Sequence, residues 1–346
     1  MKKLLVFLCL ILFLTTPVKA MEFTAPVVPD SGKDILTEEP ETFAEGLLKV
    51  ISEGLRLTHP ALVEAAGISF GLVAIVLLLS LTQGIHTSAE KTAQLVGSIA
   101  VAALLLKESA SFVSLSVQTV TELSDYGKLL LPVMTAALAA QGGVTASAAL
   151  YSGTAIFDAI LCGLISNLIV PMVYMYLALS VANCGVGEST LGNLRDFVKW
   201  LMTWSLKIVL YVFTGYIGIT GVVSGSADAA AIKAAKLTIS GMVPVVGNIL
   251  SDASETILIG AGVMKNAVGV YGLLAVLAVW IGPFVKIGVQ YLLFKFTSAV
   301  CGAFGSKQIV RLISDFSGAL GMLLAMTGTI CALLLVSTVC FMKGVG

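Results

Sequence analysis

The 346-residue sequence is poor in the residues that carry most enzyme chemistry. It has two histidines, His59 and His86, and its six cysteines show no CxxC spacing, so neither a zinc site nor a disulfide framework is indicated. It also lacks GxxxxGK[ST] and GxGxxG motifs, which leaves nucleotide chemistry without a recognisable site. Basic and acidic residues balance at 20 each, and zero net charge argues against nucleic acid as a partner. We therefore expect no cofactor, no metal and no nucleic acid.

Charge is scarce along the whole chain. Charged residues make up 12% of the sequence, about half of the ~25% found in soluble domains. Hydrophobic residues make up 58%, and the mean hydropathy is +1.01. A soluble domain of this size leaves about a quarter of its unfolded-chain surface in water, which is too much for so apolar a chain. We therefore predict an all-α fold, a polytopic α-helical membrane protein that resides in the lipid bilayer.

The first 64 residues differ from the rest. Residues 1–20 begin with Lys2 and Lys3 and continue with an apolar run, Pro17 and the small residues Val18 and Ala20. This pattern predicts a signal peptide, with an uncleaved anchor as the alternative. Residues 21–64 carry nine acidic side chains and predict an acidic extracytoplasmic leader, flexible in its first half. From Phe43 the apolar residues return at helical spacing, which predicts a short amphipathic helix before Pro60.

Six apolar segments are long enough to cross a bilayer. The second and third should form a hairpin with its turn at 151–154, and the distribution of lysine and arginine favours an external N-terminus. Residues 93–106 and 287–301 are apolar but short or charged, so we expect interfacial or re-entrant helices there. The predicted spans divide the membrane bundle into residues 65–222 and 267–346; they are 65–82, 129–149, 155–182, 200–222, 267–285 and 316–342.

Residues 223–266 separate the two parts of the bundle and are neither strongly apolar nor highly charged. Lys236 belongs to a short helix expected to lie flat on the membrane, Gly241 can end that helix, and Pro244 prevents its continuation. Asp252 and Glu255 have the spacing of a capping box, which predicts a second helix beginning at Asp252. This helix–elbow–helix is either an interfacial connector or a re-entrant loop whose broken backbone faces a cavity.

Two ionisable residues inside the predicted spans are further candidates, because a charge near the bilayer centre costs about 2.5–3.5 kcal/mol on insertion scales. Asp158 is either a turn residue close to water or a buried carboxyl group. Lys207 either extends its stem to the interface or is a cation facing the bundle interior. Asn167 and Pro171, in one predicted span, should loosen its hydrogen bonding.

Three ordered blocks around the elbow resemble the stage III sporulation protein AE family of endospore-forming bacteria. The blocks are 236–247, 250–256 and 263–269, followed by a Pro-Phe-Val-Lys step at 283–286. The agreement extends to the signal peptide, the acidic leader and the apolar C-terminal span. The candidate interaction residues within the blocks are Lys236, Gly241, Pro244, Gly247, Asp252, Glu255, Lys265 and Asn266.

The resemblance implies a non-enzymatic subunit of a mother-cell membrane complex. Such a subunit would act as platform or conduit in a channel, or feeding tube, that reaches the forespore. Its expected partners are other stage III sporulation membrane proteins, a partner in the forespore membrane and the lipid bilayer. Glycines at 215, 218 and 221 would also permit close packing of copies into a homo-oligomer. The alternative function is a secondary transporter or permease of a small solute, although the sequence shows no inverted copy of the interrupted region.

Overall fold

The computed structural model describes the backbone of residues 24–36, 42–82, 88–186, 189–242 and 247–343. Within these ranges the chain is almost entirely helical and has no β-strand, which confirms the predicted all-α class. The signal peptide predicted at 1–20 lies outside the described residues. The elements are α2 (Asp30–Lys33), α3 (Phe43–Thr82), α4 (Ser88–Ala140), α5 (Val144–Leu164), the π-helix η1 (Ile165–Ile169), α6 (Val170–Val186), α7 (Ser189–Met242), α8 (Gly247–Cys301) and α9 (Lys307–Lys343).

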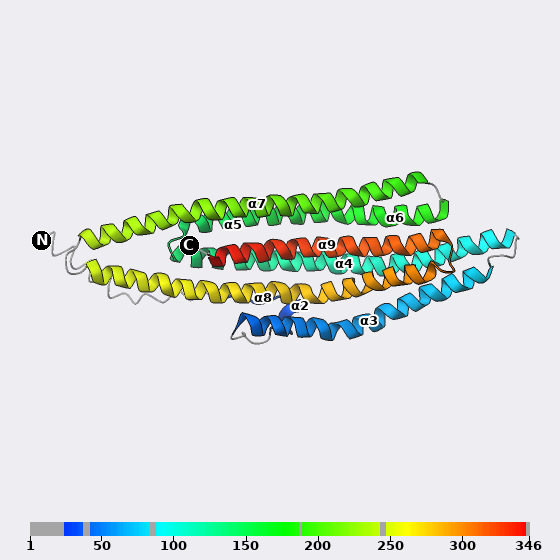
Figure 1. Cartoon of the computed structure of the whole chain (residues 1–346), viewed down its shortest axis with the longest axis horizontal. Helices are drawn as coiled ribbons and strands as arrows, with labels where there is room; N and C mark the ends of the chain where they lie inside the picture. Colours follow the sequence, from blue (N-terminus) through cyan, green and yellow to red (C-terminus); the bar gives the residue numbers. More distant parts are fainter. Residues whose placement is uncertain (1–23, 37–41, 83–87, 187–188, 243–246, 344–346) are drawn as a thin grey trace.

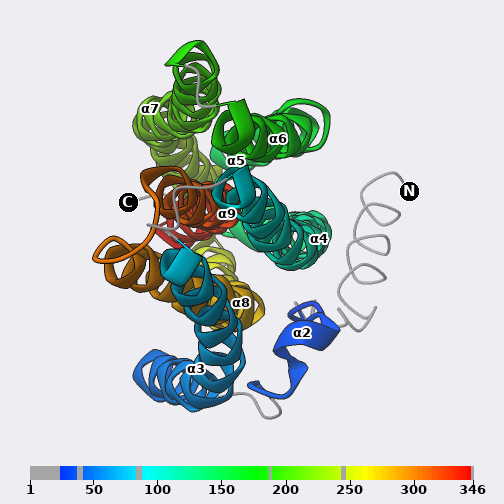
Figure 2. The same ribbon diagram turned by 90° about the vertical axis from the view of Figure 1, so that its right-hand side faces the viewer.

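The long helices run side by side along one axis (Figure 1). Viewed along that axis, α9 lies at the centre, with α5, α6 and α7 on one side, α3 and α8 on the other, and α4 beside it (Figure 2). α9 packs against α4, α5, α6, α7 and α8, and it is the most buried of the spans. The core of the bundle therefore forms around this C-terminal helix.

Six helical segments in the described part of the chain are long and apolar enough to cross a membrane, which confirms the predicted number. α5, η1 and α6 count as one continuous segment. The segments are Phe43–Leu81, Val96–Ala140, Val144–Gly185, Leu191–Ile219, Asn266–Cys301 and Lys307–Lys343. At about 1.5 Å per residue, the 54 residues of α7 extend far beyond the ~30 Å of a hydrocarbon core.

Several predicted boundaries are wrong because the helices continue through residues that were interpreted as breaks. Pro60 lies inside α3, residues 93–106 are part of α4, and residues 287–301 are part of α8. The hairpin turn lies at 141–143 instead of 151–154. Gly142 has a φ of 91°, a conformation that glycine adopts at little cost, so the chain reverses there. Residues 93–106 and 129–140 belong to the same helix, α4, and count as one candidate span, so the number of crossings stays at six.

The predicted irregularity around Asn167 takes the form of a π-helical turn. Pro171 has no N–H group with which to bond the carbonyl of Asn167, four residues earlier. The π-helix η1 covers Ile165–Ile169, ends two residues before the proline, and joins α5 to α6.

The leader is ordered between residues 24 and 36, so the prediction that this stretch is flexible is wrong. Val28, Ile35 and Leu36 are buried, and α2 packs on α8, where Gly32 lies directly over the backbone of Val279. The Ser31 hydroxyl donates a hydrogen bond to the Glu122 carboxylate of α4. Three apolar side chains and this contact hold the leader against the bundle. Figure 2 shows α2 beside α8.

Candidate functional site

The predicted interaction motif lies where α7 and α8 meet. α7 ends at Met242 and α8 begins at Gly247, while Pro244 falls outside the described residues. Asp252 is not the first residue of a helix, as the capping-box spacing predicted, because α8 is already helical from Gly247. The structure describes the backbone of the motif but few of its side chains; Asn266 is exposed. Lys236 and Gly241 lie in α7, and Glu255, Lys265 and Asn266 lie in α8.

The two helices of this motif do not turn back into the bundle. Residues 223–242 continue α7 without a break, so the predicted separate helix lying flat on the membrane is wrong. Figure 1 shows α7 and α8 running past the C-terminal end of α9 and past the turn between α4 and α5. The motif is therefore the projecting end of a long helical hairpin.

Asp158 is buried inside the bundle. Its side chain is 5% exposed, and its Oδ2 atom accepts a hydrogen bond of 2.7 Å from the hydroxyl of Ser124 on α4. Its Oδ1 atom is buried without a partner. The interpretation of Asp158 as a turn residue close to water is wrong, because α5 runs straight through the expected turn. One turn of α5 away, the hydroxyls of Thr154 and Ser337 also form a hydrogen bond, which links α5 to α9.

Lys207 is exposed on α7, so it is not a buried cation facing the interior of this chain. Of its two interpretations, extension along the helix surface agrees with this exposure. Trp200 and Trp204 lie on the same exposed face of α7 and stack with ring centroids 5.7 Å apart. An aromatic group of this kind is typical of a membrane–water interface.

A buried ion pair that sequence reasoning missed joins α7 to α9. Arg195 has a side chain 4% exposed and donates to the carboxylate of Asp315, which is 12% exposed, and also to the exposed Asp196. Tyr176 of α6 and Lys199 of α7 approach α9 at Gly318, close to the same place. Arg195 and Asp315 lie 120 positions apart in the sequence, so no local spacing marks them as a pair.

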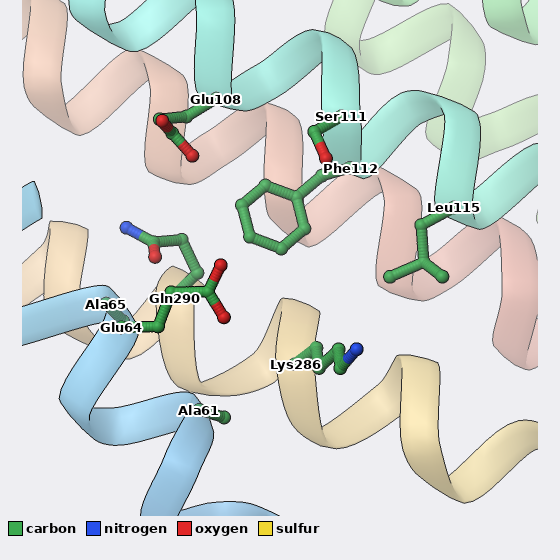
Figure 3. A pocket seen from close by; sticks show the side chains of 9 residues that line it. All are labelled: Ala61, Glu64, Ala65, Glu108, Ser111, Phe112, Leu115, Lys286 and Gln290. Carbon is green, nitrogen blue, oxygen red and sulfur yellow. The ribbon is translucent and has the colours of Figure 1, made fainter.

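A polar cavity of about 170 Å³ lies between α3, α4 and α8 (Figure 3). The residues that line it include Glu64, Glu108 and Lys286. Gln290 also lines it, with a side chain 1% exposed whose Nε2 atom has no partner. Hence the cavity has unused hydrogen-bonding capacity, whereas the hydrogen bond of Asp158 and the ion pair of Arg195 join helices.

Together, six apolar helical segments and polar groups that pair between them define a multi-pass α-helical membrane protein. The chain belongs to the family described as stage III sporulation protein AE, whose model matches residues 33–345. It is 22% identical over 206 residues to the stage III sporulation protein AE of Bacillus subtilis (strain 168), a match that covers 59% of this chain and 51% of that protein. The match thus spans about half the length of the curated relative. No solved structure matches the chain.

Proposed function

We propose that the protein is a non-enzymatic membrane subunit of the channel complex between mother cell and forespore that endospore development needs. The observation that carries this proposal is the family match over residues 33–345, nearly the whole of the chain that the structure describes. Six apolar spans fit a platform or conduit in the mother-cell membrane. Its partners would be other stage III sporulation membrane proteins and a protein of the forespore membrane.

The projecting hairpin of α7 and α8 is the part of the molecule best placed to reach those partners. Its backbone extends past the C-terminal end of α9 and past the turn between α4 and α5 (Figure 1). It also carries the candidate interaction residues, from Lys236 to Asn266. A helical hairpin can present a rigid surface at low entropic cost, which favours binding.

Deletion of residues 236–256 tests this proposal in a sporulating cell. The deletion shortens both arms of the hairpin about equally and leaves all six candidate spans intact. We expect the shortened protein to resist extraction from membranes without detergent, as the full chain should, and we expect spore formation to be lost. Normal sporulation with the shortened protein would contradict a role for the hairpin, and a full chain found in the aqueous fraction would contradict the membrane assignment.

The cavity between α3, α4 and α8 favours transport of a small solute as the second candidate function. Glu64, Glu108, Lys286 and Gln290 could bind a small polar molecule, and the cavity lies within three of the candidate spans. A transporter should move solute when the purified chain is placed alone in lipid vesicles, and Glu108→Gln should lower that flux. Flux that depends on the Glu108 carboxylate would favour this function, because a water-filled passage between copies of the chain would not need that group.

A further inference from the structure

One face of α4 carries a continuous row of exposed polar side chains. The row steps along the helix by alternating intervals of four and three residues, so its members lie on one face. It covers about 32 Å at 1.5 Å per residue, close to the ~30 Å of a bilayer core. Val96, Ile99, Leu106 and Leu129 are exposed on either side of it along the same helix. The row, here called the polar stripe, consists of Lys107, Ser111, Ser114, Gln118, Thr121, Asp125 and Lys128.

The part of the polar stripe around Thr121 and Asp125 lies at the same depth as an apolar surface on the neighbouring helix. The hydrogen bond from Ser124 to Asp158 places these two residues of α4 and α5 at one level along the bundle. Ile156 and Ile160 lie two residues either side of Asp158, which is about 3 Å along the axis. They are 57% and 51% exposed. At one depth, α5 therefore presents apolar side chains and α4 presents polar ones.

Contact between the polar stripe and lipid would be energetically unfavourable. Each charged side chain at the bilayer centre costs about 2.5–3.5 kcal/mol on insertion scales. The stripe contains Lys107, Asp125 and Lys128, of which the last two form an ion pair of 2.8 Å while their side chains stay 62% and 66% exposed. An ion pair that exposed is solvated, because hydrocarbon would leave its remaining donors and acceptors without partners.

Other polar groups continue this surface around the bundle. Ser111 belongs to the stripe and also lines the cavity that contains Gln290 (Figure 3). Gln118 donates to Glu122 over 2.8 Å, and Glu122 accepts a further hydrogen bond from Ser31 of the leader. The stripe is therefore connected to the cavity through Ser111 and to the leader through Gln118 and Glu122.

We propose that the polar stripe of α4 faces a water-filled passage that crosses the membrane and is enclosed by several copies of this chain. The stripe lies on the outside of the bundle, so one chain supplies only one wall. Copies related by rotation would each contribute an α4, in the closed arrangement that is common among homo-oligomers. This inference rests on the proposed function, for which it identifies the pore-lining helix of the conduit.

Cysteine accessibility tests the proposal in the full chain reconstituted into phosphatidylcholine vesicles. Single substitutions Ser111→Cys, Gln118→Cys and Thr121→Cys probe the stripe, and Ile156→Cys and Ile160→Cys are controls whose depth matches that of Thr121. The probe is a charged methanethiosulfonate that does not cross lipid. We expect the stripe positions to react at least about tenfold faster than the controls, since only a hydrated thiol readily forms the reactive thiolate.

Two results would overturn the proposal. Slow reaction at both sets would mean that lipid or protein covers the stripe, and fast reaction at both would place this depth outside the membrane. Each variant is compared with the parent chain, so the native cysteines can stay in place and labelling above that background is measured. The sporulation phenotype of the hairpin deletion does not depend on these reaction rates. Loss of spores with slow labelling of the stripe would contradict only the water-filled passage, and normal sporulation with fast labelling would contradict only the role of the hairpin.

Discussion

The helices α5 and α4 lie side by side yet distribute their polar side chains in different ways. On α5, Asp158 and Thr154 point into the bundle and pair with neighbouring helices, while Ile156 and Ile160 face outwards. On α4, polar side chains occur on the buried face and also on the outer face, as the polar stripe. The buried polar groups of α5 join helices, and the exposed ones of α4 must interact with a medium other than lipid. Substitutions on α5 should therefore act through lost contacts between helices, and substitutions on the outer face of α4 through changed contact with the surrounding medium.

The largest effect on the free energy of unfolding is expected where a buried charged side chain loses its partner. Arg195→Met would leave Asp315 buried without its cation, and breaking such a pair costs about 3–5 kcal/mol. Unfolding of the detergent-solubilised protein measures this loss. The double variant Arg195→Met with Asp315→Leu removes both charges and should recover most of the stability. Equal stability of the double and single variants would show that the unpaired Asp315 carboxylate is not the cause of the loss.

The next effect concerns the close approach of α5 to α7. A Cβ atom on Gly153 would lie 2.0 Å from the ring of Tyr216, whose hydroxyl donates to the carbonyl of Ala149. Gly153→Ala should displace this ring and lower the free energy of unfolding by about 1–3 kcal/mol, as overpacking does. Gly163→Ala is the matched control on the same helix, because no atom lies within 4 Å of its added Cβ. Similar thermal unfolding of the two variants would contradict the packing seen here.

A smaller effect is expected for the hydrogen bond that sets α4 and α5 at one level. A double-mutant cycle of Ser124→Ala and Asp158→Leu isolates their coupling. Interhelical hydrogen bonds in membrane proteins contribute about 0.6 kcal/mol on average and at most about 1.7. We expect a coupling within that range, measured by unfolding in detergent. A coupling of zero would remove the basis for matching Thr121 with Ile160 in depth.

The sequence predicted the all-α class and the six spans, because both depend on the amount of apolar sequence. The boundaries failed where polar residues continue a helix. In α4, the segment 107–128 has too little hydropathy to indicate a span. Its buried residues Val113, Val120 and Leu123 nevertheless recur at helical spacing, and packing against α8 and α9 keeps the helix intact. A periodicity analysis of this segment would have revealed both the helix and its polar face.

The candidate polar residues were predicted only in part, because their environment depends on distant segments. Asp158 was identified from its charge within an apolar run. Its burial was not predicted, because the chain turns at Gly142 and not at 151–154, close to Asp158. Asp315 was not identified at all, since its partner Arg195 comes from another helix. The role of residues 236–265 in interactions stays a prediction from the sequence.

The smallest effect on stability is expected on the polar stripe itself. Ser114→Leu changes an exposed side chain that the bundle does not need, so the free energy of unfolding should stay within about 0.5 kcal/mol of the parent value. Ser116→Leu is the contrasting variant two residues away, because Ser116 is fully buried and leucine would overpack the site. The sign of the Ser114 effect in lipid vesicles is informative. If lipid covered this face, leucine would stabilise the protein, because apolar side chains favour insertion. A neutral or slightly destabilising result is the one expected for a face in contact with water.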